Sequence, residues 1–290
     1  MIINLQSNHN FLLLAKSQKP KAKSQQPTTK KMEKLLVAKI GGNIVDNEDA
    51  LQNFLKDFAA IDQPKILVHG GGKIATRIAE KLGVQTQMIN GRRITSKENL
   101  DIVVQLYAGL INKNIVAALQ ATAYCNAIGF TGADANVIKA VKRPVKDIDY
   151  GFVGDVTEVN EDRIHQFIAN GLTPVFCAIT HDANGQLFNT NADTIASQIA
   201  VALSSYYEVS LYYCFELKGV LTDIKDKDSV IEKIDTEEYS KLKAQGVIAD
   251  GMLPKMKNCF DALEKGVAEV HIANAEFVNN QDVVHTTLVL

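Results

Sequence analysis

The organisation of this chain follows from the stretch Lys65-Ile66-Leu67-Val68-His69-Gly70-Gly71-Gly72-Lys73. Its apolar residues predict a buried strand, and three glycines follow that strand directly. Helical spacing then begins at once, with Ile74, Ile78 and Leu82, and Gly83 ends it. Backbone N–H groups at a helix N-terminus are unpaired, and without a Cβ the backbone can approach a phosphate or carboxylate closely. The stretch therefore predicts an anion-binding loop at the end of a strand.

The residues before this stretch repeat the pattern of a strand followed by glycine. Leu35–Ile40 predicts a buried strand that ends at Gly41 and Gly42, and residues 49–61 have helical spacing. The order strand–helix–strand is typical of a parallel sheet with helices on its faces, and such sheets bind ligands at the carboxyl ends of their strands. Lys39 is unusual, because a lysine within an apolar strand is costly unless its ammonium group meets an anion.

The composition is that of an ordinary globular protein. The chain has 290 residues, of which 46% are hydrophobic and 22% are charged, so it can bury a sizeable core. Residues 1–31 carry six lysines and no acid, which leaves 25 basic and 33 acidic residues and a net charge of −8 for the remainder. We expect no binding of nucleic acid by a body this acidic. We expect residues 1–31 to be a disordered or non-native tail ahead of Met32, and an oligomerisation helix is the alternative.

The cysteines and the apolar runs favour a cytoplasmic protein. The four cysteines are far apart in the sequence and form no CxxC pair, which favours free thiols in a reducing compartment. No apolar run approaches the roughly 20 residues that a membrane span requires, so we expect no membrane partner.

Two further basic residues require an anion. Arg93 is either part of a polar turn or a guanidinium that clamps a substrate carboxylate. Lys255 lies in the first turn of a predicted helix, where its charge opposes the helix dipole. Elsewhere, residues 98–120 predict one long helix that is apolar on more than one face, which favours burial on two sides, including against a second subunit. Residues 128–134 and 150–155 predict glycine-containing hairpins.

A series of motifs resembles the acetylglutamate kinases of the amino-acid kinase family, over about residues 34–272. The motifs are Lys39-x-Gly41-Gly42, Val68-His69-Gly70-Gly71-Gly72, Gly91-x-Arg93-x-Thr95, Asn189-x-Asn191-Ala192-Asp193 and Gly251-Met252-x-x-Lys255, with Gly129-x-x-Gly132-x-Asp134 and Gly151-x-Val153-Gly154-Asp155. Several motifs in one order are far more specific than any one of them.

The resemblance implies a fold, a reaction and an assembly. The fold would be a three-layer αβα sandwich with a mainly parallel central sheet. Residues 32–187 would form the acylglutamate-binding and dimerisation lobe, and residues 188–290 the ATP-binding lobe. The reaction would be ATP-dependent phosphorylation of the γ-carboxylate of N-acetyl-L-glutamate, the second step of arginine or ornithine biosynthesis. The cofactor would be ATP with Mg²⁺, and the assembly a homodimer or a hexamer.

The resemblance also implies roles for single residues. Lys39 and Lys255 would be the catalytic cations, and Asp193 would hold both ammonium groups. The remaining residues divide between the two ligands. The substrate would be bound by Gly71, Gly72, Arg93 and Asn189, and the nucleotide by Gly41, Gly42, Glu216, Gly251 and Met252. We expect no metal ligands from the protein.

The chain departs from the family pattern in four places. Phe215-Glu216 replaces the usual Thr-Asp, Asp250 replaces a glycine, and the glycine-rich ending is missing after Ala275. Arg92 stands where an aliphatic residue is usual, and an extra cation there could serve a substrate with an extra carboxylate. N-succinyl-L-glutamate is therefore an alternative substrate.

Other functions remain as alternatives. A non-catalytic amino-acid sensor of the same fold is one, although the two lysines and Asp193 argue against it. Carbamate kinase and aspartokinase belong to the same family. A dinucleotide-binding oxidoreductase would fit Gly70-Gly71-Gly72-Lys73-Ile74-Ala75, but Asn90 stands where the acidic residue of that motif is expected.

Overall fold

The computed structural model of the chain describes residues 32–89, 92–248, 252–278, 280 and 282–290. The predicted tail 1–31 and the predicted nucleotide-binding residue Gly251 therefore lie outside the described residues, as do Gly91 and Asp250.

Eight strands form the central sheet of the described chain. Their order is β12 (Lys233–Ile234), β14 (Thr286–Leu288), β13 (Glu269–Asn274), β11 (Glu208–Phe215), β1 (Lys34–Ile40), β2 (Lys65–His69), β8 (Thr173–Cys177) and β5 (Ala127–Phe130). Neighbouring strands are parallel except β13 and β14. The prediction of an α/β fold with a mainly parallel central sheet is confirmed.

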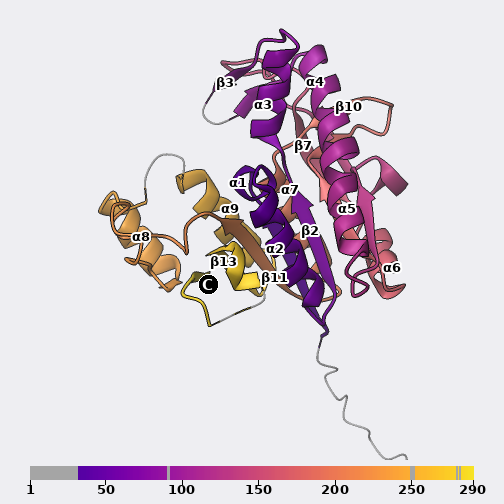
Figure 1. The fold of residues 1–290 in the computed structure, drawn as a ribbon. Helices are drawn as coiled ribbons and strands as arrows, with labels where there is room; N and C mark the ends of the chain where they lie inside the picture. The colour runs from indigo at the N-terminus through magenta and orange to yellow at the C-terminus, as the bar shows by residue number, and fades with distance from the viewer. Residues whose placement is uncertain (1–31, 90–91, 249–251, 279, 281) are drawn as a thin grey trace, which may run out of the picture. The chain divides into compact units, whose positions relative to one another are not determined.

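Helices cover both faces of this sheet (Figure 1). On one face α2 (Glu48–Ala60) packs against α5 (Asn112–Gln120), and α5 contacts β5 and β8. The other face carries α6 (Glu161–Ala169), α7 (Ala192–Leu203) and α9 (Met252–Glu264), with α7 against β1, β2 and β11. The remaining α-helices are α1 (Gly42–Val45), α3 (Gly72–Lys81), α4 (Lys97–Val104) and α8 (Thr236–Ala244).

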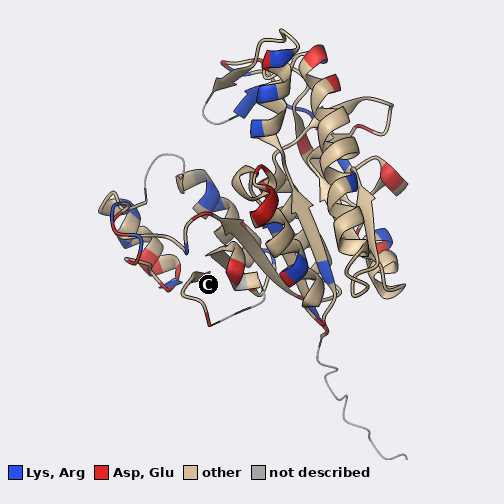
Figure 2. Ribbon diagram, in the orientation of Figure 1, with Lys and Arg blue, Asp and Glu red and all other residues tan. Residues whose placement is uncertain are grey.

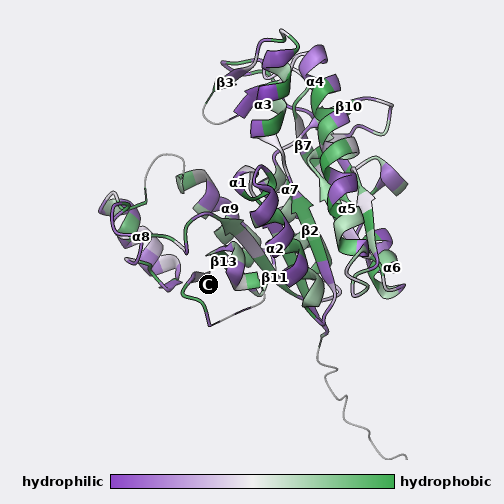
Figure 3. Ribbon diagram, viewed as in Figure 1, coloured by the Kyte–Doolittle hydropathy of each residue, from purple (hydrophilic) through white to green (hydrophobic). Residues whose placement is uncertain are grey.

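The central strands are buried from one end to the other. In β1 every residue from Leu35 to Ile40 is buried, and in β2 all five residues are buried. Strands of a parallel sheet that is covered on both faces are expected to be mainly apolar, and β2 is green over much of its length (Figure 3). Since Ile40 pairs with His69, the two strands end at the same level, and their glycine loops lie next to each other.

A second sheet of four strands lies outside the central one. Its order is β10 (Leu187–Asn189), β9 (Ile179–His181), β6 (Ile138–Lys142) and β7 (Gly154–Val159), and a separate hairpin joins β3 (Gln87–Ile89) to β4 (Arg92–Ile94).

The predicted hairpin at residues 128–134 is wrong. Residues 127–130 form β5, which joins the central sheet parallel to β8. Gly129 does not lie in a turn. A helix packs closely against the strand at this position, and a Cβ there would lie 1.8 Å from Oδ1 of Asn112. The second predicted hairpin, at residues 150–155, leads into β7, which does pair antiparallel with β6.

The long helix predicted at residues 98–120 forms, but its middle segment is not α-helical. α4 and α5 are joined by a π-helical segment, Gln105–Ile111. Among the described residues this helix, Lys97–Gln120, is long and apolar enough to cross a membrane, contrary to the expectation from single apolar runs. It packs against β5 and β8, as core helices of globular proteins do.

Candidate active site

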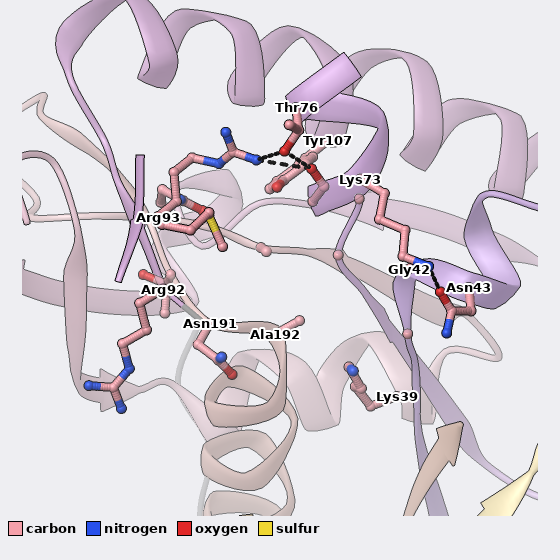
Figure 4. A pocket seen from close by; sticks show the side chains of 18 of the residues that line it. Lys39, Gly42, Asn43, Lys73, Thr76, Arg92, Arg93, Tyr107, Asn191 and Ala192 are labelled. Atoms are coloured by element: carbon pink, nitrogen blue, oxygen red, sulfur yellow. Dashed lines mark hydrogen bonds between the residues drawn. The ribbon is translucent and has the colours of Figure 1, made fainter. Parts of the chain in front are cut away.

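A cavity of about 610 Å³ lies at the carboxyl ends of the central strands (Figure 4). Most of the predicted site residues line it: Lys39, Gly41, Gly42, Gly71, Gly72, Arg93, Asn189, Glu216 and Lys255. Asp193 lines a small neighbouring cavity together with Lys255. Met252 packs against the hydrophobic core instead. The structure therefore brings residues from distant parts of the sequence to one place.

Lys39 is held by an acid at the start of α7. Its ammonium nitrogen lies 2.7 Å from Oδ1 of Asp193, and Lys39 is only 7% exposed. The backbone of Asp193 is fixed as well, because the Tyr213 hydroxyl donates a hydrogen bond to its carbonyl oxygen at 3.1 Å. Asn191 caps α7 by accepting from the Thr194 N–H at 3.1 Å. The buried lysine thus has the anionic partner that its position in a strand requires.

Lys255 has a different neighbour. Its nitrogen lies 4.3 Å from the centre of the Phe215 ring, and Lys39 lies 5.2 Å from the centre of the same ring. Among the described residues no carboxylate forms an ion pair with Lys255. The expectation that Asp193 holds both ammonium groups is therefore met for Lys39, while Lys255 rests on an aromatic ring.

The two glycine loops form one wall of the cavity. Neither α1 nor α3 has a side-chain cap, so the backbone N–H groups of both first turns have no capping oxygen. Gly71 is required for close packing, since a Cβ there would lie 2.4 Å from Cδ1 of Ile111 and 3.0 Å from the Tyr107 ring. Lys73 donates a hydrogen bond to Asn43 and so ties one loop to the other (Figure 4).

Arg93 lies at the other end of the cavity, on β4. It is buried, and Nη2 donates to the Gly72 carbonyl oxygen at 2.9 Å and to Thr76 Oγ1 at 2.7 Å. Nη1 donates to Thr86 Oγ1 at 3.0 Å. No described carboxylate forms an ion pair with this guanidinium, and a buried charge without a counter-ion favours binding of an anion.

Other polar groups surround this end. Asn189 donates to Thr95 Oγ1 at 3.1 Å, on the chain just after β4. Arg92 is exposed and lines the cavity, as does Arg143, whose guanidinium is paired with Asp155 at 2.5 Å. Figure 2 shows basic residues gathered on α3 and on the hairpin beside it. This end of the cavity therefore suits an acidic small molecule.

His69 is a packed residue at the end of β2. It is fully buried, its Nδ1 hydrogen bonds to the Gly70 carbonyl oxygen at 2.9 Å, and Nε2 accepts from Asn112 at 3.1 Å. Burial lowers the pKa of His69 to about 4, so the ring is neutral at neutral pH. The carbonyl can only accept, which places the proton on Nδ1.

Tyr107 and Arg143 are among the residues that line the cavity but were not singled out from the sequence. Tyr107 follows the apolar spacing of its helix, so its hydroxyl could not be told from a core side chain. Burial raises its pKa to about 12, and the hydroxyl therefore keeps its proton. Arg143 lies in a segment without a motif.

Two lysines, two uncapped glycine loops and a buried arginine lie around one cavity, which therefore suits anionic ligands. The chain belongs to the amino acid kinase family, whose sequence profile matches residues 34–274. The acetylglutamate kinase of Cytophaga hutchinsonii is 55% identical over 263 residues, which cover 89% of this chain and 99% of that relative. The acetylglutamate kinase of Bacteroides thetaiotaomicron is 53% identical over 86% of this chain and 97% of the relative.

Solved structures agree on the fold. Carbamate kinase from Giardia lamblia bound to AMP-PNP superposes with a TM-score of 0.62 at 15% identity, covering 89% of this chain and 98% of that one. The resemblance drawn from the motifs is confirmed by the family match and by these relatives.

Proposed function

We propose that this chain transfers the γ-phosphoryl group of ATP to the γ-carboxylate of N-acetyl-L-glutamate, the second step of arginine or ornithine biosynthesis. The names of its relatives support this reaction. One observation carries the proposal: Lys39 and Lys255, from separate elements, line the same cavity as both glycine loops.

The chemistry needs positioned charge more than it needs a base. A γ-carboxylate has a pKa of about 4.3 and is ionised at neutral pH. One of its oxygens attacks the γ-phosphorus, the bond from phosphorus to the β,γ-bridging oxygen breaks, and ADP leaves. Charge develops on the phosphoryl oxygens during this transfer, and fixed cations and backbone N–H groups stabilise it. In this proposal Lys39, held by Asp193, and Lys255 supply that charge.

The two ends of the cavity would bind the two substrates. Arg93, in the lobe 32–187, would bind the α-carboxylate of the acylglutamate, and Asn189 would bind its α-carboxylate or acetamide end. ATP would bind to the lobe 188–290, where exposed Glu216 lines the cavity. Mg²⁺ usually binds largely through substrate phosphates, so we expect it to enter the site with ATP.

The test is the release of ADP by the purified protein with ATP, Mg²⁺ and N-acetyl-L-glutamate. Free L-glutamate and a reaction without acceptor are the controls, and hydroxylamine should trap the acyl phosphate as a hydroxamate. Lys39→Ala should remove the activity. Absence of turnover with any acylglutamate would overturn the proposal and favour an amino-acid sensor of the same fold.

A second acceptor is favoured by one observation. Arg92 lines the cavity beside Arg93 and forms no ion pair with a described carboxylate. An acyl group with its own carboxylate, as in N-succinyl-L-glutamate, could meet this charge. Comparing kcat/KM for the two acyl-glutamates decides between them, and Arg92→Leu should lower only the value for the succinyl form.

We also expect a cytoplasmic homodimer, with a hexamer as the alternative. Leu110 in the π-helical segment is 54% exposed, although the helix around it is apolar. Light scattering of the purified protein measures the assembly directly.

A further inference from the structure

Phe215 has a place in the site that no motif explains. It is the last residue of β11, it lines the main cavity, and it also lines the small cavity beside Asp193. The nitrogens of Lys255 and Lys39 lie 4.3 and 5.2 Å from the centre of its ring. One aromatic ring thus stands next to both ammonium groups of the proposed phosphoryl-transfer site.

The contact between the Phe215 ring and Lys255 is a cation–π attraction, and it differs from the contacts of Lys39. A cation within about 6 Å of an aromatic centre is attracted by the negative face of the ring, and the effect grows as the cation loses water. Lys39 has Asp193 at 2.7 Å in addition, whereas Lys255 has no ion pair with a described residue. Of the two lysines, only Lys255 therefore has the ring as a neighbour without also having an ion pair in the described structure.

The identity of this partner affects catalysis. A lysine that is paired with a carboxylate must give up part of that interaction before it meets a phosphate, because the carboxylate competes for its charge. An aromatic ring attracts the ammonium group but adds no negative charge to the site. Asp193 lines the same small cavity as Lys255 and is paired with Lys39.

We infer that Phe215 is a positioning residue that holds Lys255 in place for the transferring phosphoryl group. The inference rests on the proposed function, because it assumes that Lys255 meets the phosphoryl group. It assigns a role to the position where the family usually has threonine.

The test compares Phe215→Leu, which removes the ring but keeps an apolar side chain, with Phe215→Tyr, which keeps the ring. We expect Phe215→Leu to lower kcat about tenfold and to change KM for N-acetyl-L-glutamate by no more than about twofold. Phe215→Tyr should restore kcat to within about threefold of wild type. Equal losses in both variants, an unchanged kcat in Phe215→Leu, or a rise in KM for ATP alone would each overturn the inference.

A double mutant separates action through Lys255 from a packing defect. If the ring acts through this lysine, adding Phe215→Leu to Lys255→Ala should lower kcat no further, because the two changes remove one interaction. A further tenfold loss in the double mutant would contradict the inference. Thermal unfolding of every variant identifies any loss of fold.

A measurement without turnover keeps this inference distinct from the proposed reaction. Labelling with acetic anhydride, read by mass spectrometry, compares Lys255 with exposed Lys257 on the same helix. The rate at Lys255 relative to Lys257 should rise severalfold in Phe215→Leu and stay at the wild-type value in Phe215→Tyr. Equal rates in all three proteins would refute the contact, even where the kinase reaction is established.

Discussion

Replacing Arg93 with alanine tests the substrate end of the proposed site. Arg93 is 6% exposed, and its guanidinium donates to the Gly72 carbonyl, Thr76 and Thr86 at 2.9, 2.7 and 3.0 Å. A guanidinium has more N–H donors than these three hydrogen bonds use, and this one forms no ion pair with a described carboxylate. We therefore expect the α-carboxylate of the acylglutamate to meet its charge.

The size of the effect follows from that contact. A hydrogen bond to a charged group contributes about 1.5–3 kcal/mol, and about 1.4 kcal/mol corresponds to a factor of ten. Arg93→Ala should therefore raise KM for N-acetyl-L-glutamate about 10- to 100-fold. The contact persists from the ground state to the transition state, so kcat should change much less. Steady-state ADP release measures both constants, and KM for ATP is the internal reference.

The protein contacts of Arg93 require a control, because alanine removes them too. Thr86→Val removes one of these hydrogen bonds and leaves the charge, so KM for the acceptor should stay within about threefold of wild type. Arg93→Lys keeps the charge without the planar fork and should give an intermediate KM. If Arg93→Ala folded normally and left KM for the acceptor unchanged, the assignment of this end of the cavity would be wrong.

Three further changes test the site and the fold. Lys255→Ala should lower kcat about 100-fold or more, because a cation that acts in the transition state is lost; steady-state kinetics measure it. His69→Gln should reduce the loss of stability between pH 7 and pH 4 by about 3 kcal/mol in urea unfolding. The pKa of His69 is about 4 in the folded chain, and its ordinary value is 6.5. Between these values the unfolded chain binds the proton more readily than the folded chain, so the stability decreases as the pH is lowered. Gly151→Ala should destabilise the fold by about 2–4 kcal/mol, because φ is +69° and a Cβ would lie 2.3 Å from the Thr95 carbonyl oxygen.

Two of these changes have a matched control. Exposed Lys257→Ala should leave kcat as it is. Gly171→Ala has a similar φ of +75° but open space around it, so it should cost only about 1 kcal/mol. Equal costs at the two glycines would mean that the approach to Thr95 is unimportant. A His69→Gln protein with the wild-type pH dependence would assign the acid sensitivity to other groups.

The sequence predicted the elements whose burial is continuous. β1 and β2 are apolar runs that end at glycines, so their nature and their loops could be recognised. Gly129 was misleading, because glycine serves a turn and a close helix contact equally well in a sequence. The π-helical segment Gln105–Ile111 keeps ordinary helical spacing and has no signal of its own.

The site was predicted less completely than the fold. Lys39 and Lys255 each required an anion, and that could be argued from their local positions. The ring beside them could not be predicted, because residue 215 is 40 positions from residue 255 in the numbering and no local pattern links them. Residues that become neighbours only through the order of the strands can be identified as partners only from the structure.

The order of strands also explains why the charges meet where they do. β1 lies between β2 and β11 in the sheet. The strands β2, β5 and β8 are added on one side of β1 before β11 is added on the other side, and parallel sheets bind ligands at such a switch point. Lys39 pairs in register with Tyr213, whose hydroxyl reaches the backbone of Asp193. Since side chains alternate along a strand, Phe215 stands on the same face as Tyr213, two residues further toward the cavity. A shift of β1 by one residue would send Lys39 to the opposite face, away from both the acid and the ring.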